Sequence, residues 1–506
     1  MTRTYPREVD VVIVGSGPTG AAYARILSER APHATIAMFE VGPTVSDPPG
    51  SHVKNIVDAD ARASAQSASQ GPDAGTATVS SPGAVRAGDR RGRPGTFLLP
   101  AGYRVDGEDG LPVAAFSSNV GGMGAHWTAA CPRPGGLERV DFLDDLDELL
   151  AEGDRLLGVT TTAFDGSSFG ELVRSRLSAV VDEDRTPEQR VQRMPLAVHR
   201  RDDGALVWSG SDVVFGDVTR ANENFSLFDE TLVTGILVED GRAVGVSVQD
   251  RRDGSRSEVR SAFVVVAGDA LRTPQLLWAS GIRPAALGRT LNDQHQVVYA
   301  ARLRDVAPSA PAAGGGALSE QAGVSWVPYT DDLPFHGQVM QLDASPIPVA
   351  DDDPVVPGSI VGIGLFCAKD VQWDDRIEFD ESERDWYGMP AMTLHYSLTD
   401  VDRDRLEAAR GFIQELAVAV GEPLGDRPFS LPYGSSLHYQ GTTRMGAEDD
   451  GRSVCSRDSE VWAVPGLFVA GNGVIPTPTA CNPTVTSVAF AVRGARAIAE
   501  RLTASA

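Results

Sequence analysis

Residues 9–20 read VDVVIVGSGPTG, and this stretch decides the fold class. Val9–Val14 is a short apolar run that suits a buried parallel strand, and Gly15–Gly20 is a G-x-G-x-x-G turn. An amphipathic helix over Ala21–Glu29 and a second strand over Ala34–Glu40 follow directly. Because a strand, a helix and a strand in this order form a βαβ unit, we predict an α/β fold with a Rossmann-like nucleotide-binding domain.

The glycine turn is suited to hold a dinucleotide. Gly15 allows the tight turn, Gly17 lets the backbone approach a pyrophosphate, and Gly20 permits close packing of helix on strand. Thr19 lies at the helix N-terminus, whose N–H groups face the anion. Glu40, at the end of the second strand, is placed to accept hydrogen bonds from ribose hydroxyls and to repel a 2′-phosphate. A purely structural glycine turn is the alternative, and the motif does not distinguish FAD from NAD.

The chain is long and acidic. Its 506 residues exceed one simple core and allow two intertwined domains. A hydrophobic content of 42% and a charged content of 23% are ordinary for a globular protein. The net charge of −24 argues against nucleic acid and anionic membrane surfaces as partners, whereas a neutral small molecule meets no such repulsion. Solubility alone also explains the acidity.

The cysteines and the N-terminus indicate a compartment. The four cysteines are scattered, and no spacing resembles a metal site or a disulfide framework. The first residues, MTRTYPREVD, lack an apolar signal core, and no apolar run approaches the roughly 20 residues that span a bilayer. We therefore expect a soluble, cytoplasmic protein without a metal ion.

Two blocks of the chain interrupt the nucleotide-binding pattern. Residues 47–93 are rich in Ser, Ala, Gly, Pro and Asp without sustained periodicity, so they are either a surface loop or an active-site lid. Residues 301–421 read as longer strands and loops and contain a helix over Asp400–Val420. We expect this second block to form a substrate-facing sheet.

We predict two domains, each built from separate segments of the chain. The nucleotide-binding domain takes residues 1–46, 94–135, 205–300 and 425–506. The substrate-binding domain takes residues 136–204 and 301–424 on a mostly antiparallel sheet, and residues 47–93 form a flexible insertion or possible lid.

Three further polar or glycine-rich regions lie far from the first turn. They read VGGMGAHWT (120–128), LHYQGTTRMG (437–446), and AGNGVIP (470–476) followed by ACNPTVT (480–486). Glycines in the first region suit backbone that passes close to a planar ring, and His126 is either a packed structural histidine or a residue at the ring edge. Asn482 and Pro483 precede a predicted helix, whose N-terminal N–H groups would point at an electron-rich group. The pair is alternatively only a helix-start signal.

At these residues the chain resembles the glucose–methanol–choline (GMC) oxidoreductase superfamily, and within it the pyranose oxidases. The V-G-G-M-x-x-H-W-T, H-x-x-G-T-x-R-M-G and A-x-N-P-T patterns and the GNGVIP stretch carry the resemblance, whereas the first glycine turn is shared by many flavoproteins. Together they cover nearly the whole chain. The resemblance implies FAD as the cofactor, a Rossmann-like FAD-binding domain and an interleaved substrate-binding domain.

Among pyranose-oxidase-like enzymes the chain is most similar to the compact bacterial type that oxidises C3 of glucosides and C-glycosides. It is short for a fungal pyranose oxidase and lacks room for the segments through which those enzymes tetramerise, so we expect a monomer. The implied reaction oxidises a secondary hydroxyl, at C3 or C2, of a pyranose sugar or a C- or O-glycoside to the keto sugar. The electrons then pass to O2 or another acceptor.

The resemblance also assigns a catalytic pair. His438 matches the general base and Asn482 the group that hydrogen-bonds the same substrate oxygen, and the two lie 44 positions apart (482 − 438), close to the family spacing. Histidine suits the base because its ordinary pKa of about 6.5 leaves much of it neutral near physiological pH. Asparagine does not titrate, so it orients the substrate and stabilises a developing alkoxide. The hydride passes to flavin N5.

Two residues of the second glycine-rich region are expected at the flavin. Thr128 corresponds to a threonine near N5 whose hydroxyl tunes flavin reactivity. His126 sits where fungal pyranose oxidases attach FAD covalently, but the flanking Gly124-Ala125 departs from the Ser-Thr of the fungal pattern. We therefore predict non-covalent FAD.

The remaining cofactor contacts are carried over from the family pattern. The adenine half is expected near Val233 and Ala267-Gly268, and Gly471 and Asn472 are expected near the pyrophosphate. The other expected contacts are Gly121, Gly122, Met123, Gly124, Trp127, Pro483 and Thr484.

Two other functions stay open. Another superfamily enzyme would act on a sterol, choline or a simple alcohol and needs an apolar pocket or an aromatic cage. A flavin-binding scaffold without turnover would not need both His438 and Asn482. The expected pocket block mixes polar groups with rings, which suits a polyhydroxy ligand better; these residues are Gln338, Gln341, Asp343 and Ser345 beside Trp326 and Tyr329.

Overall fold

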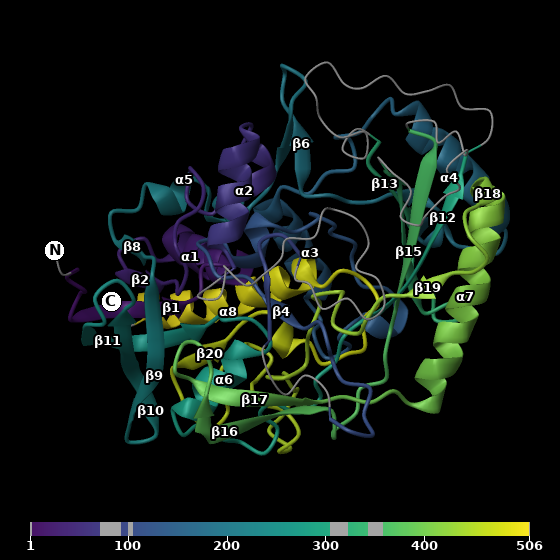
Figure 1. Ribbon diagram of the computed structural model, residues 1–506. Coiled ribbons are helices and arrows are strands. Elements are labelled where there is room, and N and C mark those ends of the chain that lie inside the picture. Colours follow the sequence, from purple (N-terminus) through teal and green to yellow (C-terminus); the bar gives the residue numbers. More distant parts are fainter. Residues whose placement is uncertain (1–2, 71–92, 100–104, 304–321, 343–357, 505–506) are drawn as a thin grey trace.

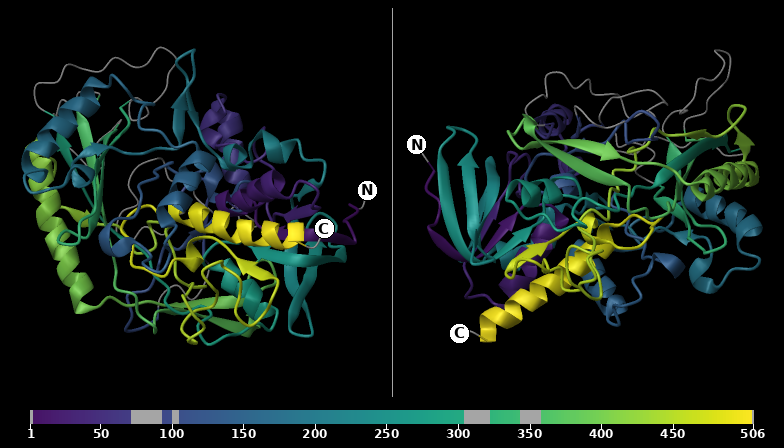
Figure 2. Two further views of the ribbon diagram at one scale, coloured as in Figure 1. Left: turned by 180° about the vertical axis from the view of Figure 1, so that it is seen from behind. Right: turned by 90° about the horizontal axis from the view of Figure 1, so that it is seen from below.

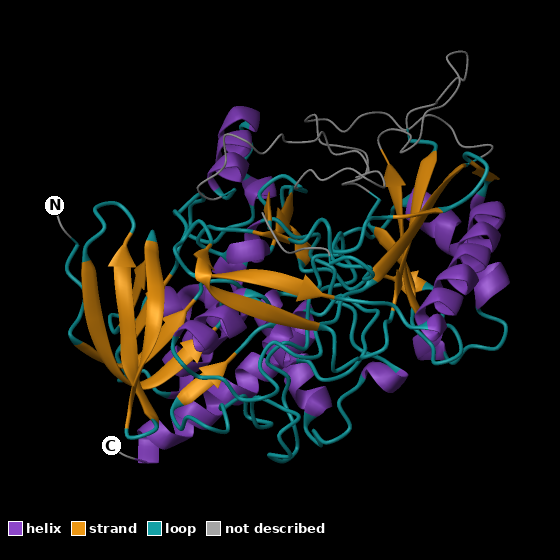
Figure 3. Cartoon of the chain, turned by 60° about the horizontal axis from the view of Figure 1, so that its bottom comes forward, coloured by secondary structure: helices purple, strands orange, loops and turns teal. Residues whose placement is uncertain are grey.

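The computed structural model describes residues 3–70, 93–99, 105–303, 322–342 and 358–504. Two large β-sheets lie at opposite ends of the molecule, and helices pack beside each of them (Figures 1 and 3). The expected pocket positions 343 and 345, and residues 71–92 of the expected insertion, lie outside the described residues.

The first sheet is mainly parallel. Its strand order is β8-β2-β1-β11-β10-β9, and β20 pairs with the C-terminal part of β11. Strands β9 and β10 form an antiparallel arm beside the parallel strands. The strands are β1 (Glu8–Val14), β2 (Ile36–Phe39), β8 (Phe225–Phe228), β9 (Thr231–Glu239), β10 (Arg242–Asp250), β11 (Arg256–Val266) and β20 (Leu467–Val469).

The βαβ opening predicted from residues 9–40 is confirmed. β1 pairs with β2 on one side and with β11 on the other, which explains its apolar run, because a central parallel strand is buried on both faces. Helix α1 (Pro18–Arg30) begins three residues before the predicted start. Proline favours the first helical position, because its missing N–H would have no partner there and its φ is already helical.

Four helices pack together beside this sheet. Helix α8 (Thr484–Ala504) contacts α1 and α3 (Leu146–Leu157), and α5 (Ser211–Arg220) contacts α1. Figure 2 shows α8 running from the middle of the molecule to the C-terminus. Helix α8 begins directly after Pro483, as predicted from the Asn482-Pro483 pair, and α3 begins at Leu146. The acidic residues Asp147 and Glu148 favour a helix N-terminus at that point.

The second sheet is antiparallel. Its order is β18-β12-β15-β14-β13-β5, with β19 also paired to β12. The strands are β5 (Gln192–Arg193), β12 (His295–Arg302), β13 (Val324–Val327), β14 (Phe335–Leu342), β15 (Ile360–Cys367), β18 (Glu422–Pro423) and β19 (Phe429–Ser430).

A long helix covers this second sheet. Helix α7 (Asp400–Val420) packs on β12 and β15, and α4 (Ser168–Val181) packs beside it. A capping box fixes the start of α7. Thr399 Oγ1 accepts a hydrogen bond from Asp402 N (3.0 Å), and the Asp402 carboxylate accepts one from Thr399 N (2.9 Å). The predicted span of α7 is confirmed.

Shorter elements connect the two sheets. They are α6 (Arg272–Ala279) and the strand pairs β3 (Phe97–Leu98)–β4 (Ala115–Phe116), β6 (Val198–Arg200)–β7 (Leu206–Trp208) and β16 (Arg376–Arg384)–β17 (Pro390–His395).

The segment predicted to lack regular structure contains helix α2 (Ala59–Ala68), capped by Asp58. Only Ala65 of this helix is buried, so its residues carry no apolar periodicity for a sequence pattern to detect.

The predicted fold class is confirmed: a Rossmann-like α/β part is combined with a mostly antiparallel second sheet. The two sheets draw on alternating parts of the chain, and the exact domain boundaries stay a prediction. Among the described helices, none combines the length and the apolar character needed to cross a bilayer.

Candidate active site

The first glycine turn, between β1 and α1, forms one wall of a cavity. Gly15 has φ +98°, and a Cβ there would collide with the carbonyl oxygen of Ala267. A Cβ at Gly20 would collide with the carbonyl oxygen of Gly15. Gly17 has no heavy atom within 4 Å of its Cβ position and lines the cavity, so the backbone is open to a ligand there. This is the geometry of a pyrophosphate cradle.

Glu40 links the first glycine turn to the second glycine-rich region. Its carboxylate is buried and accepts hydrogen bonds from Ser16 N (3.1 Å), Ser16 Oγ (2.7 Å) and Gly42 N (3.0 Å). Ser16 Oγ in turn accepts one from Gly121 N (3.0 Å). Burial raises the pKa of Glu40, and these hydrogen bonds oppose that rise. Glu40 also lines the cavity, next to the end of β2, where a ribose is expected.

Most of the predicted cofactor residues surround one cavity of about 330 Å3. Both the first glycine turn and the pair His438 and Asn482 contribute to its lining. The predicted residues that line it are Gly15, Gly17, Thr19, Glu40, Gly122, Met123, Gly124, His126, Trp127, Thr128, Val233, Ala267, Gly268, His438, Gly471, Asn472, Asn482 and Thr484. The predicted residues that do not line it are Gly20, Gly121, Gln338, Gln341 and Pro483.

Residues 120–128 contain a short 3-10 helix, η2 (Gly122–Ala125), that ends next to His126. The His126 Nε2 atom lies 2.9 Å from Ser69 Oγ and 3.2 Å from Asn119 Oδ1. Burial lowers the pKa of His126 to about 4, so this imidazole is neutral at physiological pH. Thr128 lines the cavity, and its side chain is exposed.

The structure brings His438 and Asn482 together at one end of the cavity. Asn482 Nδ2 lies 3.3 Å from His438 Nε2. Asn482 Oδ1 accepts a hydrogen bond from Gln338 Nε2 (2.6 Å), which orients the amide so that its Nδ2 faces His438. A histidine nitrogen and an amide N–H therefore converge on one point, where a substrate oxygen could contact both.

Gln294 determines which nitrogen of His438 carries the proton. Its Nε2 donates to Cys481 O (2.7 Å) and Thr479 Oγ1 (3.1 Å), so its Oε1 faces His438 Nδ1 at 2.7 Å. An amide oxygen only accepts hydrogen bonds, so Nδ1 must carry the hydrogen. His438 Nε2 then carries the lone pair of the ring, which lies 3.3 Å from Asn482 Nδ2.

The surroundings of His438 keep it uncharged. Burial lowers the pKa of His438 to about 3, and the charges of Arg93 and His336 act in the same direction. Its ring also stacks on Phe366, with centroids 5.4 Å apart. The imidazole is therefore neutral at physiological pH and able to accept a proton. A negatively charged ligand in the cavity would stabilise the protonated imidazole and so raise the pKa of His438.

Three residues of the site were not predicted from the sequence: Gln294, Arg93 and Phe366. The one available signal was the polar run Asn292–His295, which leads into the apolar alternation of β12.

Gln341, which was predicted to lie in the substrate pocket, is not brought to the site. Its Nε2 donates to Gly358 O at 2.8 Å instead. Since Gln338 and Gln341 are three positions apart on one strand, their side chains point to opposite faces.

Replacing Gln294 by methionine should slow flavin reduction by substrate about 10- to 100-fold, in the range seen when a supporting hydrogen bond to a functional histidine is lost. Methionine keeps the side-chain length but leaves the Nδ1 proton without an acceptor, so the ring can rotate or change tautomer. Stopped-flow absorbance of the flavin would measure the effect. A Gln294→Glu variant keeps an acceptor for Nδ1 but, like the methionine variant, loses the donor to Cys481 O. Slower reduction in Gln294→Met than in Gln294→Glu would therefore report on the Nδ1 acceptor, whereas wild-type rates in Gln294→Met would contradict the tautomer argument.

Comparison with known proteins agrees with this geometry. GMC oxidoreductase family patterns match residues 206–296 and 376–491. The chain is 70% identical to a C-glycoside 3-oxidase of Arthrobacter globiformis, over 99% of this chain and 97% of that protein. It is 68% identical to a C-glycoside 3-oxidase of Microbacterium trichothecenolyticum, over 99% of each. A pyranose 2-oxidase of Tricholoma matsutake is 33% identical, over 97% of this chain and 94% of that protein.

The fold also matches a solved structure. Pyridoxine 4-oxidase from Mesorbium loti superposes with a TM-score of 0.68 at 19% identity, over 97% of this chain and 99% of that chain. At this identity the likeness concerns the fold alone.

The chain belongs to the GMC oxidoreductase family. Enzymes of this family are FAD-dependent flavoproteins, and the described residues fit that cofactor. The backbone is open at Gly17, where a Cβ would occupy the space needed for a pyrophosphate. Glu40 lies at the end of the second strand, and the same cavity continues to His438 and Asn482.

Proposed function

We propose that this protein oxidises the C3 hydroxyl of the pyranose ring of a sugar or glycoside to the ketone, with FAD as the cofactor. The observation that carries the proposal is the His438–Asn482 pair, which faces the same cavity as the pyrophosphate cradle. Identities of 70% and 68% to two C-glycoside 3-oxidases support C3 of a glycoside as the target.

In the proposed mechanism, His438 and Asn482 bind one substrate oxygen. His438 Nε2, left unprotonated by Gln294, accepts the hydroxyl proton, while Asn482 Nδ2 donates a hydrogen bond to the same oxygen as negative charge develops there. A positioned donor of this kind contributes about 2–4 kcal/mol to transition-state stabilisation. The carbon that carries this hydroxyl loses a hydride, and FAD, when bound, would supply the group that accepts it.

The polar residues beside this pair favour a polyhydroxy substrate over a sterol or choline. Gln338 contacts Asn482 and also lies 3.3 Å from His336 Nε2. His336 accepts a hydrogen bond from Trp326 Nε1 (2.8 Å) and, because burial lowers its pKa to about 3, is neutral. Gln338, His336 and Trp326 do not line the cavity, but they keep the surroundings of the pair neutral. Neutral hydrogen-bonding groups such as His438 and Asn482 suit sugar hydroxyls, whereas a cation such as choline needs an aromatic cage.

Anaerobic addition of glucose or a C-glucoside to the yellow protein should bleach the flavin, and NMR of the product should show a 3-keto sugar. A 2-keto product would favour the pyranose 2-oxidase reaction, which the 33% identical relative makes the second candidate. If no sugar bleaches the flavin but another alcohol does, the substrate class is wrong. If no alcohol bleaches it, a non-catalytic flavoprotein is the better description.

FAD in this protein is proposed to be non-covalent. Gly124-Ala125 departs from the Ser-Thr of the fungal pattern, and His126 Nε2 lies within hydrogen-bond distance of Ser69 and Asn119. His126 Nδ1 is buried and has no hydrogen-bond partner among the described residues, so the proposal rests on the contacts of Nε2 and on the flanking sequence. Acid precipitation should therefore release all of the yellow colour into the supernatant, whereas a yellow pellet would show a covalent bond.

The electron acceptor, the oligomeric state and the compartment also belong to the proposal. We propose O2 or another acceptor, a monomer and a cytoplasmic location. Hydrogen peroxide formed with glucose in air would identify O2 as the acceptor, and light scattering during gel filtration would measure the oligomeric state.

A further inference from the structure

A buried carboxylate holds the loop that carries His438. Asp293 is fully buried directly before Gln294. Its Oδ1 accepts a short hydrogen bond from Ser436 Oγ, and its Oδ2 accepts one from Gly434 N (3.1 Å). Ser436 Oγ then accepts a hydrogen bond from the backbone N of His438 (3.0 Å). Asp293 is thus connected to the backbone of the proposed base through one hydroxyl.

The loop held by Asp293 has a strained turn next to His438. Leu437, between Ser436 and His438, has φ +61°, a left-handed conformation that non-glycine residues rarely adopt. Such a conformation costs on the order of 1–3 kcal/mol and persists only where the surroundings impose it. The hydrogen bonds on both sides of Leu437 impose it here and so set the direction in which the imidazole points.

A second buried carboxylate holds the loop that carries Asn482. Glu138 Oε1 accepts hydrogen bonds from Ala480 N (2.7 Å) and Cys481 N (2.8 Å), and its Oε2 accepts one from Gly135 N (2.8 Å). Glu138 is almost completely buried. The backbone directly before Asn482 is therefore fixed in the same way as the backbone before His438.

The two carboxylates differ from charges that stabilise a fold by pairing. Among the described residues, no lysine or arginine forms an ion pair with either one, although the charge of Arg93 acts on Asp293 from further away. Burial raises the pKa of Asp293 to about 7 and also raises that of Glu138. A buried carboxylate without an ion pair lowers stability unless hydrogen bonds compensate it. Here the compensating hydrogen bonds come from the loops at 434–436 and 480–481, so each carboxylate is tied to the loop that carries one member of the pair.

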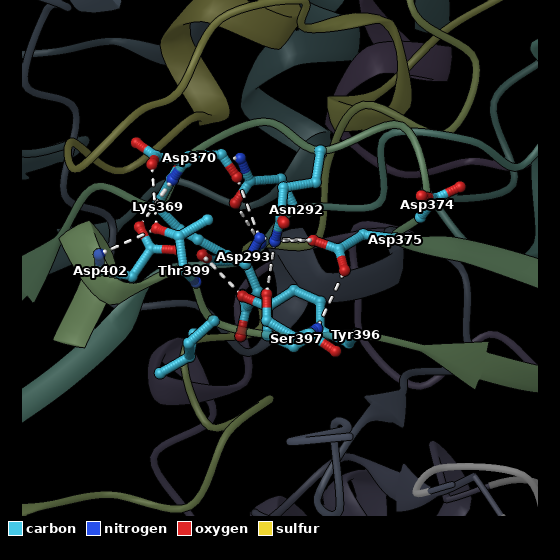
Figure 4. A network of polar contacts seen from close by, with 12 residues as sticks. Asn292, Asp293, Lys369, Asp370, Asp374, Asp375, Tyr396, Ser397, Thr399 and Asp402 are labelled. Carbon is cyan, nitrogen blue, oxygen red and sulfur yellow. Dashed lines mark hydrogen bonds and ion pairs between the residues drawn. The ribbon is translucent and has the colours of Figure 1, made fainter. Parts of the chain in front are cut away.

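Asp293 is held in place by groups behind the site. Its carbonyl oxygen accepts a hydrogen bond from Tyr396 OH (3.3 Å), which also lies 3.0 Å from His295 Nε2. Figure 4 shows Asp293 beside Tyr396 and Asn292, and the Asn292 side chain also accepts a hydrogen bond from the backbone N of Asp293 (2.8 Å). The backbone of Asp293 is therefore held by groups on the side away from His438.

We propose that Asp293 and Glu138 are positioning residues that set the separation and orientation of His438 and Asn482 for the oxidation. Each acts through backbone N–H groups or a serine hydroxyl and touches neither the substrate nor the cofactor cavity. Gln294 joins the two loops from the middle, because its amide contacts both His438 and the carbonyl of Cys481. The inference rests on the proposed function of this pair.

The test compares Asp293→Asn and Glu138→Gln with Asp402→Asn, all measured as FAD-loaded enzymes. Each substitution keeps the side-chain shape and replaces one acceptor oxygen by a donor. Asp402 is the control for a buried carboxylate elsewhere: it accepts hydrogen bonds from Asp370 N (2.8 Å) and Thr399 N (2.9 Å) at the start of α7, and it also pairs with Arg405 (3.2 Å). The readouts are the rate of flavin reduction by glucose, the KM for glucose, FAD content, and hydrogen exchange of the backbone amides.

We expect flavin reduction to slow on the order of 10²-fold in the Asp293 and Glu138 variants, since misplacement by about 1 Å can cost that much. FAD content and KM should stay near wild type, and the Asp402 variant should reduce its flavin at the wild-type rate. Hydrogen exchange should accelerate at residues 434–438 in Asp293→Asn and at residues 480–481 in Glu138→Gln. Wild-type reduction rates with unchanged exchange in these segments would overturn the inference.

If Asp293→Asn does not fold, a second variant tests the same contact. Ser436→Ala removes only the hydroxyl between Asp293 and His438 N, and it should slow flavin reduction with FAD still bound. Wild-type reduction in this variant would also overturn the inference. Failure of the wild-type enzyme to be reduced by glucose or a C-glucoside would instead contradict the proposed function.

Discussion

Replacing His438 by alanine should slow flavin reduction by sugar about 10²- to 10⁴-fold, the usual contribution of a positioned general base. The variant loses the one nitrogen lone pair that faces both Asn482 and the cavity. FAD should remain bound, because the pyrophosphate cradle at Gly17 lies at the other end of the cavity. Stopped-flow absorbance under anaerobic conditions gives the rate, and the visible spectrum gives the FAD content.

A second histidine serves as the control for this result. His395 is partly buried on β17, contacts Glu108 (2.9 Å) and Glu378 (3.1 Å), and does not line the cavity. His395→Ala should therefore keep the wild-type rate of flavin reduction even if it lowers the melting temperature. A His438→Ala enzyme that holds FAD and is reduced at the wild-type rate would show that another group accepts the proton.

The glycine turn and its strands were predictable from the sequence, because their physics is local. An apolar run of strand length, glycines at fixed spacing and a following helix are constraints within 40 residues, and the structure confirms them. Helix α7 was predictable for a similar reason, because Thr399 and Asp402 form its cap within one turn. The meeting of His438 and Asn482 was expected from resembling motifs and not from spacing.

The supporting residues of the site could not be predicted in this way. Gln294, Asp293 and Glu138 act through partners between about 140 and 345 positions away in the chain, so nothing in their neighbourhood indicates a role. In the sequence, nothing distinguishes a buried carboxylate from the many exposed acidic residues of this chain.

Gln341 is not placed at the site, because residue type alone does not show which face of a strand a side chain occupies. A shift of three positions along a strand reverses the face.

Replacing Gly17 by valine should reduce FAD affinity on the order of 10²-fold without unfolding the protein, because about 3 kcal/mol of phosphate hydrogen bonding is lost. Gly17 has φ −62° and ψ 178°, a conformation that valine adopts readily. Apart from its two chain neighbours, no residue has a heavy atom within 4 Å of its Cβ position, and Gly17 lines the cavity, so we expect the added methyl groups to enter the space proposed for the pyrophosphate. The purified variant should be colourless, and titration with FAD measures the loss.

The control for this change is Gly411→Val on the exposed side of α7, where the Cβ position also has no neighbour within 4 Å. This variant should remain yellow, because the substitution adds the same atoms far from the cavity. A colourless Gly17→Val protein with the far-ultraviolet circular dichroism of the wild type would locate the defect in the cradle and not in the fold. A Gly17→Val protein that retains a full complement of FAD would mean that the cofactor phosphates do not approach this turn, and the orientation of the whole cofactor in the cavity would then have to be reversed.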